Sequence, residues 1–354
     1  MAVIVNSAKL RQLVTEIYLA LGLSDAQAER LSDSLVAADL WGHSSHGVLR
    51  TSWYGERLKT GAMQACADIE ILTDTGPLLA LDGHNGIGQM ITHKAVQLVG
   101  QRARQYGVGC ASIRRSGHFG TAMYFTKLLA EQNMIGFLTT NASPSMAAFG
   151  GAEKLVGNNP QSWSAPTNLA APFILDIAHT TVARGKLHLA KDRQEPIPGD
   201  WAVSRHGLPT TDPAEAILGT LLPMAGHKGF GLSAMMDILS GVLSGGAFGT
   251  GVNGPYVADQ QSGACHFLFA IDIAQLRELD AFKTDMGKLI EQWKTGQKAD
   301  GVTEIYYPGE KEHRHRQEAE KNGLFLADDT LSNLVRFAQE CGLYITADAL
   351  KLKP

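Results

Sequence analysis

The chain has 354 residues, of which 44% are apolar and 19% charged, and its net charge is −4 from 31 basic and 35 acidic residues. This composition is typical of a folded protein of about two domains and excludes a disordered chain. No basic block suggests nucleic acid as a partner, and no run of about 18 apolar residues suggests a membrane span.

The cysteines and the N-terminal segment indicate the cellular compartment of the protein. Cys66, Cys110, Cys265 and Cys341 lie far apart and show no paired spacing. The segment MAVIVNSAKLRQ lacks the basic and apolar pattern of a signal peptide. We therefore expect reduced thiols and a cytoplasmic protein.

The first forty residues are expected to be helical. Apolar residues repeat at helical spacing from Leu10 to Ile17, and Gly22 ends that helix. A capping-box pattern, S-D-A-Q, begins a second helix at Ser24. The polar stretch GHSSHG, 42–47, follows this second helix directly, in a position where loops often carry sites.

From about residue 68, strands and helices alternate. The predicted strands are 69–74, 77–83, 108–114, 134–141, 172–178 and 266–272, and the predicted helices include 91–106, 120–133 and a buried one at 229–245. A last helix follows Asp328, a candidate N-cap, and stops at Gly342. The simplest architecture is an α/β domain from 75 to 310, with 1–74 and 311–354 packed together as a discontinuous helical domain.

Glycine-rich nucleotide motifs are missing from the sequence. There is no GxGxxG after an early strand and no GxxxxGK[ST], so an ordinary doubly wound dinucleotide fold is not indicated. The cluster GHNGIG, 83–88, is more typical of a turn than of a phosphate loop.

Two histidine motifs are the main catalytic candidates. In GHSSHGVLR, His46 can exchange a proton, Ser45 can relay it, and Arg50 offers a fork for a carboxylate. In RRSGHFGTA, His118 falls at a strand-to-helix turn, where a helix N-terminus can receive an anion. The alternatives are a surface loop with incidental histidines for the first motif, and a capping or core histidine for the second.

Three further segments carry polar side chains with two interpretations each. Asn158 and Asn159 could bind substrate or stitch their loop, and the proline after them favours extended geometry at Asn159. Asp176 ends a predicted strand, where a carboxylate binds ribose hydroxyls or caps the next helix. His227 and Lys228 precede a predicted helix, where a cation opposes the helix dipole and suggests an anionic ligand.

Twelve histidines make a metal site the competing interpretation. However, the sequence contains no HExxH, and its HSSH and HRH spacings fall in predicted loops. It also lacks the GxSxG of a serine hydrolase. We expect no metal, and a metal-dependent hydrolase or lyase that uses the histidine-rich loops stays as the alternative class.

Seven segments together resemble the malate/L-lactate dehydrogenase-like family of NAD(P)-dependent oxidoreductases, with the ureidoglycolate branch nearest. They are SSHGVLR, SGHFGTA, FGGAEKLVGNNP, LDIAHTTVARGK, GLPTTDP, GHKGFGLSAMMDILSGVLSGGAFG and YYPGE. Their order and their coverage of nearly the whole chain make the resemblance specific. It implies a non-Rossmann, mixed-sheet nucleotide-binding domain, a nicotinamide cofactor and a homodimer.

The resemblance also implies roles for individual residues. The implied catalytic residues are His46, His118 and Ser45; the substrate-binding residues are Arg50, Asn158, Arg184 and Gly185; the cofactor-binding residues are Asp176, Ile177, Ala178, His227, Lys228, Gly309 and Glu310. The implied reaction moves a hydride between nicotinamide and C2 of a small 2-hydroxy or 2-oxo acid, such as malate, lactate, sulfolactate or ureidoglycolate.

Two departures from the family pattern bear on the substrate. Cyclic-imine reductases of the family carry an aspartate where this chain has Lys186, which favours a 2-hydroxy acid and keeps imine reduction as the alternative. Asn158 replaces the threonine of a common G-T-N-P motif, so the identity of the acid stays open. No Arg or Lys pair requires a 2′-phosphate, which favours NAD and leaves NADP possible.

Overall fold

A seven-stranded mixed sheet forms the centre of the computed structural model, which describes residues 2–352. Its strands, in spatial order, are β2 (Glu70–Asp74), β3 (Leu78–Asp82), β4 (Val108–Ser116), β10 (Ala264–Asp272), β5 (Met134–Thr140), β6 (Gln161–Ala165) and β7 (Phe173–Ile177). Only β3 and β4 run parallel, and every other neighbouring pair is antiparallel. The predicted mixed-sheet, non-Rossmann α/β class is therefore confirmed.

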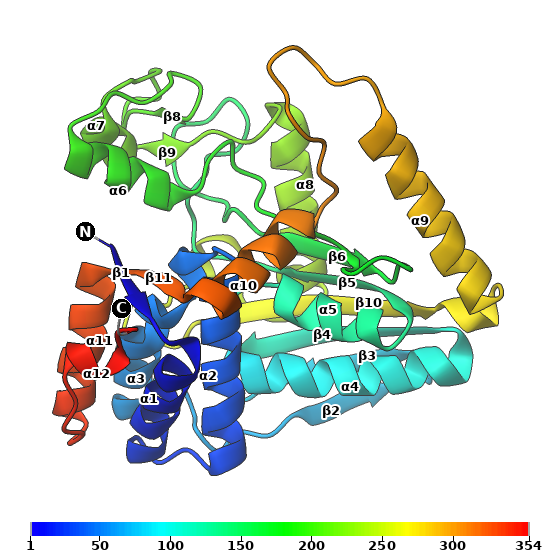
Figure 1. Cartoon of the computed structure of the whole chain (residues 1–354), viewed down its shortest axis with the longest axis horizontal. Coiled ribbons are helices and arrows are strands. Elements are labelled where there is room, and N and C mark those ends of the chain that lie inside the picture. Colours follow the sequence, from blue (N-terminus) through cyan, green and yellow to red (C-terminus); the bar gives the residue numbers. More distant parts are fainter. Residues whose placement is uncertain (1, 353–354) are drawn as a thin grey trace.

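Helices cover both faces of this sheet (Figure 1). On one face lie α4 (Gly88–Tyr106) and α5 (Met123–Glu131), whose apolar sides pack on the strands. On the other face lie α8 (His227–Asp237) and the π-helical turn that continues it, Ile238–Val242. The left-handed Gly107 ends α4 as predicted, with φ +83°.

The two ends of the chain pack together beside the sheet (Figure 1). Their elements are β1 (Ala2–Val5), α1 (Ser7–Ala20), α2 (Asp25–Leu40), α3 (Thr51–Lys59), α10 (Glu310–Asn322), β11 (Leu324–Ala327), α11 (Asp328–Glu340) and α12 (Ala347–Leu350). They share one apolar cluster, and β1 pairs antiparallel with β11. The domain division at residues 75 and 310 stays a prediction.

A small lobe rises above one end of the sheet (Figure 1). It contains α6 (Arg184–Arg193), β8 (Ala202–Val203), α7 (Pro213–Leu218) and β9 (Thr220–Leu221), around an apolar cluster of its own. A long helix, α9 (Leu279–Thr295), projects from the opposite side of the molecule. The sequence patterns predicted none of the elements of the lobe, nor β1 and β6.

Several local predictions were wrong. The helix at 229–245 forms, but its outer side chains Leu232, Met235, Ile238 and Val242 are 41–53% exposed rather than buried, because they face away from the sheet. The HRH triplet lies inside α10, not in a loop. The capping box at Ser24 is confirmed, whereas Asp328 is the first residue of α11 rather than its cap.

Within residues 2–352, no helix is both long and apolar enough to cross a membrane.

Candidate active site

The two predicted catalytic histidines lie face to face. His46 ends a 3₁₀ turn, Ser44–His46, that follows α2, and His118 follows β4. Their rings are stacked, with centroids 5.7 Å apart and planes inclined by 19°. Chain segments 72 positions apart in the sequence therefore form one site.

His46 is held by its own loop. Its Nδ1 lies 2.9 Å from Ser45 Oγ, and Arg50 Nε donates to the Ser45 carbonyl oxygen at 2.7 Å. The Arg50 guanidinium stacks over Trp53, 4.1 Å from the ring centroid. Burial, and then the nearby charge of Arg50, lower the pKa of His46 to about 3, so the ring is neutral at pH 7.

His118 is held by two groups at a single nitrogen. The Tyr54 hydroxyl lies 2.7 Å from Nδ1, and the backbone N–H of Gly120 donates to the same atom at 3.2 Å. Burial, followed by the charge of Arg50, lowers the pKa of His118 well below its ordinary value. Burial also raises the pKa of Tyr54 to about 12, so its hydroxyl keeps its proton.

One face of α3 supplies cations to this site. Arg50, Tyr54 and Arg57 repeat at helical spacing, and Arg57 is buried, with Nη1 donating to the Val257 carbonyl oxygen at 2.5 Å. Within residues 2–352, no carboxylate forms an ion pair with Arg50 or Arg57. Two unpaired guanidinium groups beside two neutral histidines make the site suited to an anion.

The sequence patterns missed three members of this site. Tyr54 and Arg57 could have been found from their spacing after Arg50, which places all three on one helix face. Gln89, on α4, is buried and lies close enough to Tyr54 to influence its hydroxyl. No sequence signal marked Gln89.

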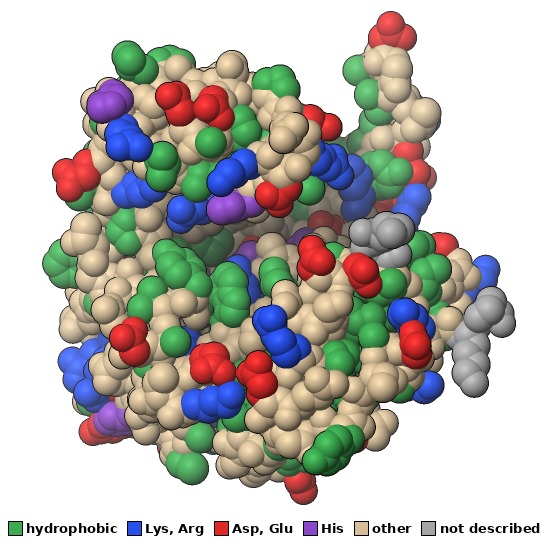
Figure 2. Space-filling model, turned by 90° about the vertical axis from the view of Figure 1, so that its left-hand side faces the viewer, with side chains coloured by type: hydrophobic (Ala, Val, Ile, Leu, Met, Phe, Trp, Pro, Cys, Tyr) green, Lys and Arg blue, Asp and Glu red, His purple; other side chains and the backbone are tan. Residues whose placement is uncertain are grey.

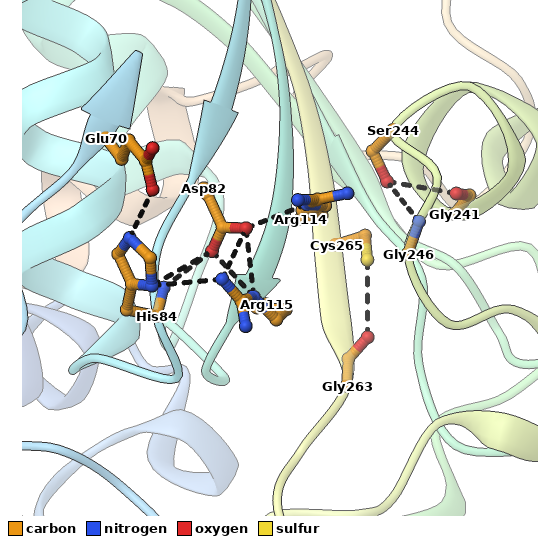
Figure 3. Close-up of polar contacts among 10 residues, drawn as sticks. All are labelled: Glu70, Asp82, His84, Arg114, Arg115, Gly241, Ser244, Gly246, Gly263 and Cys265. Atoms are coloured by element: carbon orange, nitrogen blue, oxygen red, sulfur yellow. Dashed lines mark hydrogen bonds and ion pairs between the residues drawn. The ribbon is translucent and has the colours of Figure 1, made fainter. Parts of the chain in front are cut away.

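A buried carboxylate fixes the chain that leads to His118. Asp82, at the end of β3, accepts hydrogen bonds from Arg114 Nε at 2.7 Å and Arg115 Nε at 2.8 Å (Figure 3). Burial alone would raise the pKa of Asp82, but the hydrogen bonds from Arg115, the His84 backbone and Arg114 lower it to about 2. The carboxylate thus ties the ends of β3 and β4 together.

The turn after β3 then grips the backbone before His118. Gly83 N donates to Arg114 O at 2.9 Å and Asn85 N to Arg115 O at 2.6 Å. Arg115 adopts a left-handed conformation, with φ +50°. Gly88 lies so close to this segment that a Cβ there would be 2.2 Å from the carbonyl oxygen of Gly117. GHNGIG is therefore the predicted turn, and it orients His118.

Asp176 and the other predicted cofactor residues of β7 lie at the end of that strand. Asp176 Oδ2 accepts from Thr121 Oγ1 and from Met123 N, both at 2.8 Å. It thus caps α5, an earlier helix, rather than the next one, while Ile177 and Ala178 beyond it are half-buried.

Gly309 and Glu310 lie at the N-terminus of α10, where Gly309 packs against the start of β7 and Glu310 is bound by other side chains of the protein. Glu310 forms ion pairs with Lys294 at 2.5 Å and Arg314 at 2.7 Å. Gly309, with φ +94°, lies against Ile174, where a Cβ would be 3.0 Å from the backbone nitrogen.

His227 and Lys228 are the first two residues of α8, and both are exposed. Gly226, the residue before them, belongs to the lining of a cavity of about 530 Å³, which is formed mainly by residues 147–151 and 220–226. The Phe149 ring on this cavity lies 5.8 Å from that of His227. Neither His46 nor His118 lines the cavity, so the cavity and the histidine pair are separate features of the structure.

The side chains of Asn158 and Asn159 have different environments. Asn159 is buried, accepts from Ala142 N and donates to Ser233 O, both at 2.9 Å. Its φ is +28°, so the extended geometry predicted from the following proline was wrong, because these two bonds fix the residue otherwise. The Asn158 side chain makes no hydrogen bond with the described residues, while its carbonyl accepts from His179 N.

Arg184 and Gly185 begin α6 on the lobe, and both are exposed. Figure 2 shows a hollow between the lobe and the body of the molecule, with Lys, Arg and His side chains gathered along its upper rim. In the part of the chain that the structure describes, no group of three or more His, Cys, Asp or Glu side chains is placed to hold a metal ion.

Comparisons with known proteins cover nearly the whole chain. A family model described as malate/L-lactate dehydrogenase matches residues 5–335. The chain is 34% identical over 343 residues to the malate/(S)-sulfolactate dehydrogenase of Methanothermus fervidus, covering 97% of this chain and 99% of that protein. It is 33% identical over 335 residues to the ureidoglycolate dehydrogenase (NAD(+)) of Escherichia coli, covering 94% and 95%.

Solved structures agree with these sequence matches. The sulfolactate dehydrogenase from Methanocaldococcus jannaschii superposes with a TM-score of 0.92 at 33% identity, covering 98% of this chain and 99% of that one. The delta1-piperideine-2-carboxylate reductase from Pseudomonas syringae superposes with a TM-score of 0.83 at 27% identity, covering 94% and 99%. The likeness thus includes proteins named for hydroxy acids and one named for a cyclic imine.

Proposed function

The chain belongs to the malate/L-lactate dehydrogenase family of oxidoreductases, and from this premise we propose that it moves a hydride between a nicotinamide cofactor and C2 of a small 2-hydroxy or 2-oxo acid. The observation that carries the proposal is the stacked, neutral pair His46 and His118 beside Arg50, whose guanidinium has no carboxylate partner among residues 2–352.

Arg50 is the group that binds the substrate carboxylate in this proposal. Its Nε donates a hydrogen bond to the Ser45 carbonyl oxygen, and its guanidinium plane stacks on the Trp53 ring. These two contacts orient the guanidinium before substrate binds. A guanidinium that is held in place binds a carboxylate with little further loss of freedom. With the carboxylate on Arg50, the neighbouring C2 oxygen comes to the imidazole rings, which hold or exchange its proton.

The residues near α8 fit a dinucleotide cofactor. Lys228 and the N-terminus of α8 offer positive charge, and no acidic side chain pairs with Lys228 in the described chain. The adjacent cavity of about 530 Å³ has the size of a ligand site, and its lining includes Ala225 and Gly226, the two residues before α8. When bound, the nicotinamide supplies or accepts the hydride. We favour NAD and keep NADP as the alternative.

The acid is proposed as a class, with malate, lactate, sulfolactate and ureidoglycolate as its candidates. The names of the relatives support such acids. Cyclic-imine reduction stays the second candidate because one solved neighbour bears that activity in its name. Lys186 argues against imine reduction. This residue is an exposed cation on α6, with Nζ 5.9 Å from the Trp201 ring centroid, and a cation cannot replace a carboxylate in a proton relay.

A homodimer and a cytoplasmic location are also proposed. The outer face of α8 and its π-helical turn exposes Leu232, Met235, Ile238 and Val242 in one stripe, which a second copy of the chain would cover. The four cysteines are free, as in proteins of a reducing compartment.

Binding of NADH and NADPH to the purified protein tests the proposal. The five tryptophans should transfer excitation energy to a bound dihydronicotinamide, so saturable quenching of their emission is the expected result. The tighter ligand identifies the cofactor, and a panel of 2-hydroxy and 2-oxo acids then identifies the substrate. The absence of binding by either nucleotide would contradict the proposal.

A further inference from the structure

We infer that Tyr54 and Gly120 fix His118 as a hydrogen-bond donor that keeps its proton, and that His46 is the histidine that moves the proton of the C2 oxygen. The inference rests on the proposed function and divides the work of its two histidines. It also assigns Tyr54 a role as a positioning residue.

The first step is the partner chemistry at His118 Nδ1. A backbone N–H can only donate, and Gly120 N–H is directed at this nitrogen from 3.2 Å. Nδ1 must therefore carry a lone pair, and the Tyr54 hydroxyl at 2.7 Å donates to it as well. Two donors on one nitrogen leave a single tautomer for the neutral ring, with its proton on Nε2.

The second step is that this tautomer does not change during the reaction. His118 is stacked on His46 and lies near Arg50, and the positive charge of Arg50 opposes a second proton on either ring. Neutral His118 with Nε2–H can donate a hydrogen bond to the substrate oxygen but has no lone pair with which to take its proton. It acts as a preorganised donor to a developing oxyanion.

The third step is the contrast with His46. The partner of its Nδ1 is the Ser45 hydroxyl, 2.9 Å away, which can donate or accept, so both tautomers are available. The charged and titratable groups around His46 are Arg50, His43 and His118. A substrate carboxylate on Arg50 neutralises the guanidinium charge, the largest of these charge effects on His46, and so makes protonation of His46 easier.

The proton balance then closes through His46 alone. In oxidation, the substrate O–H bond breaks and its proton goes to His46 Nε2 as the hydride leaves C2 for the nicotinamide. In reduction, the hydride arrives at C2 and the oxygen takes the proton from protonated His46. Protonated His46 then passes its Nδ1 proton to the exposed Ser45 hydroxyl and on to water, which leaves the ring neutral, and the reverse route reloads it for reduction. His118 holds the same Nε2 proton in every step.

Glutamine variants separate a donor from a proton carrier, because an amide can donate a hydrogen bond but cannot exchange a proton. His118→Ala should lower kcat about 10²-fold, as loss of an oxyanion donor does. His118→Gln should restore most of the lost activity. Its kcat should stay within about tenfold of the parent kcat, because a factor of about ten corresponds to the free energy of one hydrogen bond. His46→Gln should lose at least about 10²-fold, as His46→Ala does, and should lose the pH dependence of kcat.

Tyr54→Phe distinguishes positioning from proton delivery. It should lower kcat about tenfold and leave the pH profile unchanged, because Gly120 still holds Nδ1. Tyr18→Phe is the matched control, since that buried hydroxyl bonds Thr51 O, 3.3 Å away, and Tyr18 belongs to the terminal helices. Loss of the pH dependence in Tyr54→Phe would show that Tyr54 delivers the proton and would overturn the assignment.

The tautomer can be measured without any turnover. In protein labelled with 15N-histidine, the signals that disappear in His118→Gln belong to His118, and they should show a protonated Nε2 and an unprotonated Nδ1. A protonated Nδ1, or a pH dependence of kcat that survives in His46→Gln and vanishes in His118→Gln, overturns the inference. Absence of nicotinamide binding would instead count against the proposed function, because the nitrogen signals do not depend on it.

Discussion

Gly47 lies directly against the carboxylate of Asp39: a Cβ placed at Gly47 would be 2.0 Å from Asp39 Oδ1. Asp39 Oδ2 also accepts from the backbone N–H of Val48 at 2.8 Å. This buried carboxylate at the end of α2 therefore fixes the backbone that immediately follows His46. Burial raises the pKa of Asp39 to about 7, so the position is costly to keep ionised.

Asp39→Asn should stabilise the protein above pH 7. The folded pKa of about 7 lies above the ordinary 3.8, so the wild-type stability is fully present below about pH 4 and falls as the pH rises through 7. Asparagine keeps an oxygen for Val48 N–H and never ionises. Thermal unfolding at pH 5 and pH 8 should show a gain of at most about 4 kcal/mol at pH 8 and a much smaller one at pH 5. Equal gains at both pH values would contradict the assignment.

Gly47→Ala should damage the site through the same contact. The new methyl group must displace the Asp39 carboxylate, which is backbone-anchored through Val48 and cannot swing away freely. We expect a loss of about 1–3 kcal/mol of stability, as for overpacking, together with a fall in kcat. Gly61→Ala is not a suitable control because Gly61 has φ +76°; Gly185→Ala, which meets nothing within 4 Å, is suitable for stability. Unchanged kcat and melting temperature in Gly47→Ala would contradict the contact.

Arg50→Lys should weaken substrate binding more than turnover. Lysine keeps the charge but loses the bidentate fork and the stack on Trp53. Since a hydrogen bond to a charged group is worth about 1.5–3 kcal/mol, KM for the acid should rise about tenfold to a hundredfold. Arg316→Lys on α10, where the side chain pairs with Glu320 far from the histidine motifs in sequence, is the matched control. An unchanged KM would show that the carboxylate binds elsewhere.

The sequence indicated the two histidine loops because each sits at the end of a strongly patterned element, α2 or β4. It did not indicate Tyr54 as part of the site, because an α3 residue becomes functional only when His118 packs beside it. That contact depends on the turn 83–88, which the sequence indicated, and on the left-handed conformation of Arg115, which no local pattern indicates.

The lobe escaped prediction for a different reason. Its strands β8 and β9 have two residues each, too few to show an alternating pattern. The exposure of α8 was mispredicted because an apolar helix face has the same sequence pattern whether it is buried against a sheet or exposed at the surface. Periodicity indicates that a face is apolar but not what covers it.

Asp82→Asn should uncouple His118 from its support. The folded pKa of about 2 lies below the ordinary 3.8, so the carboxylate stabilises the fold above about pH 4, and this contribution is lost as the pH falls through 2. The variant should lose about 2 kcal/mol at pH 7, by thermal or urea unfolding, and should show a smaller loss at pH 3. Its kcat should fall while KM for the acid changes little, because Arg50 is untouched. A raised KM with unchanged kcat would place the effect elsewhere.

Replacing Arg115 should reverse the usual order of alanine and glycine. Both substitutions remove the guanidinium that donates to Asp82, so they lose the same ion pair. At an ordinary position glycine is the less stable of the two. Arg115 has φ +50°, a conformation that costs a residue with a Cβ about 1–2 kcal/mol and costs glycine nothing. Arg115→Gly should therefore unfold at a higher temperature than Arg115→Ala and keep more of the parent kcat, since the backbone before His118 stays in place. If alanine proves the more stable, the left-handed turn does not exist in solution, and the support for His118 must come from Asp82 and Arg114 alone.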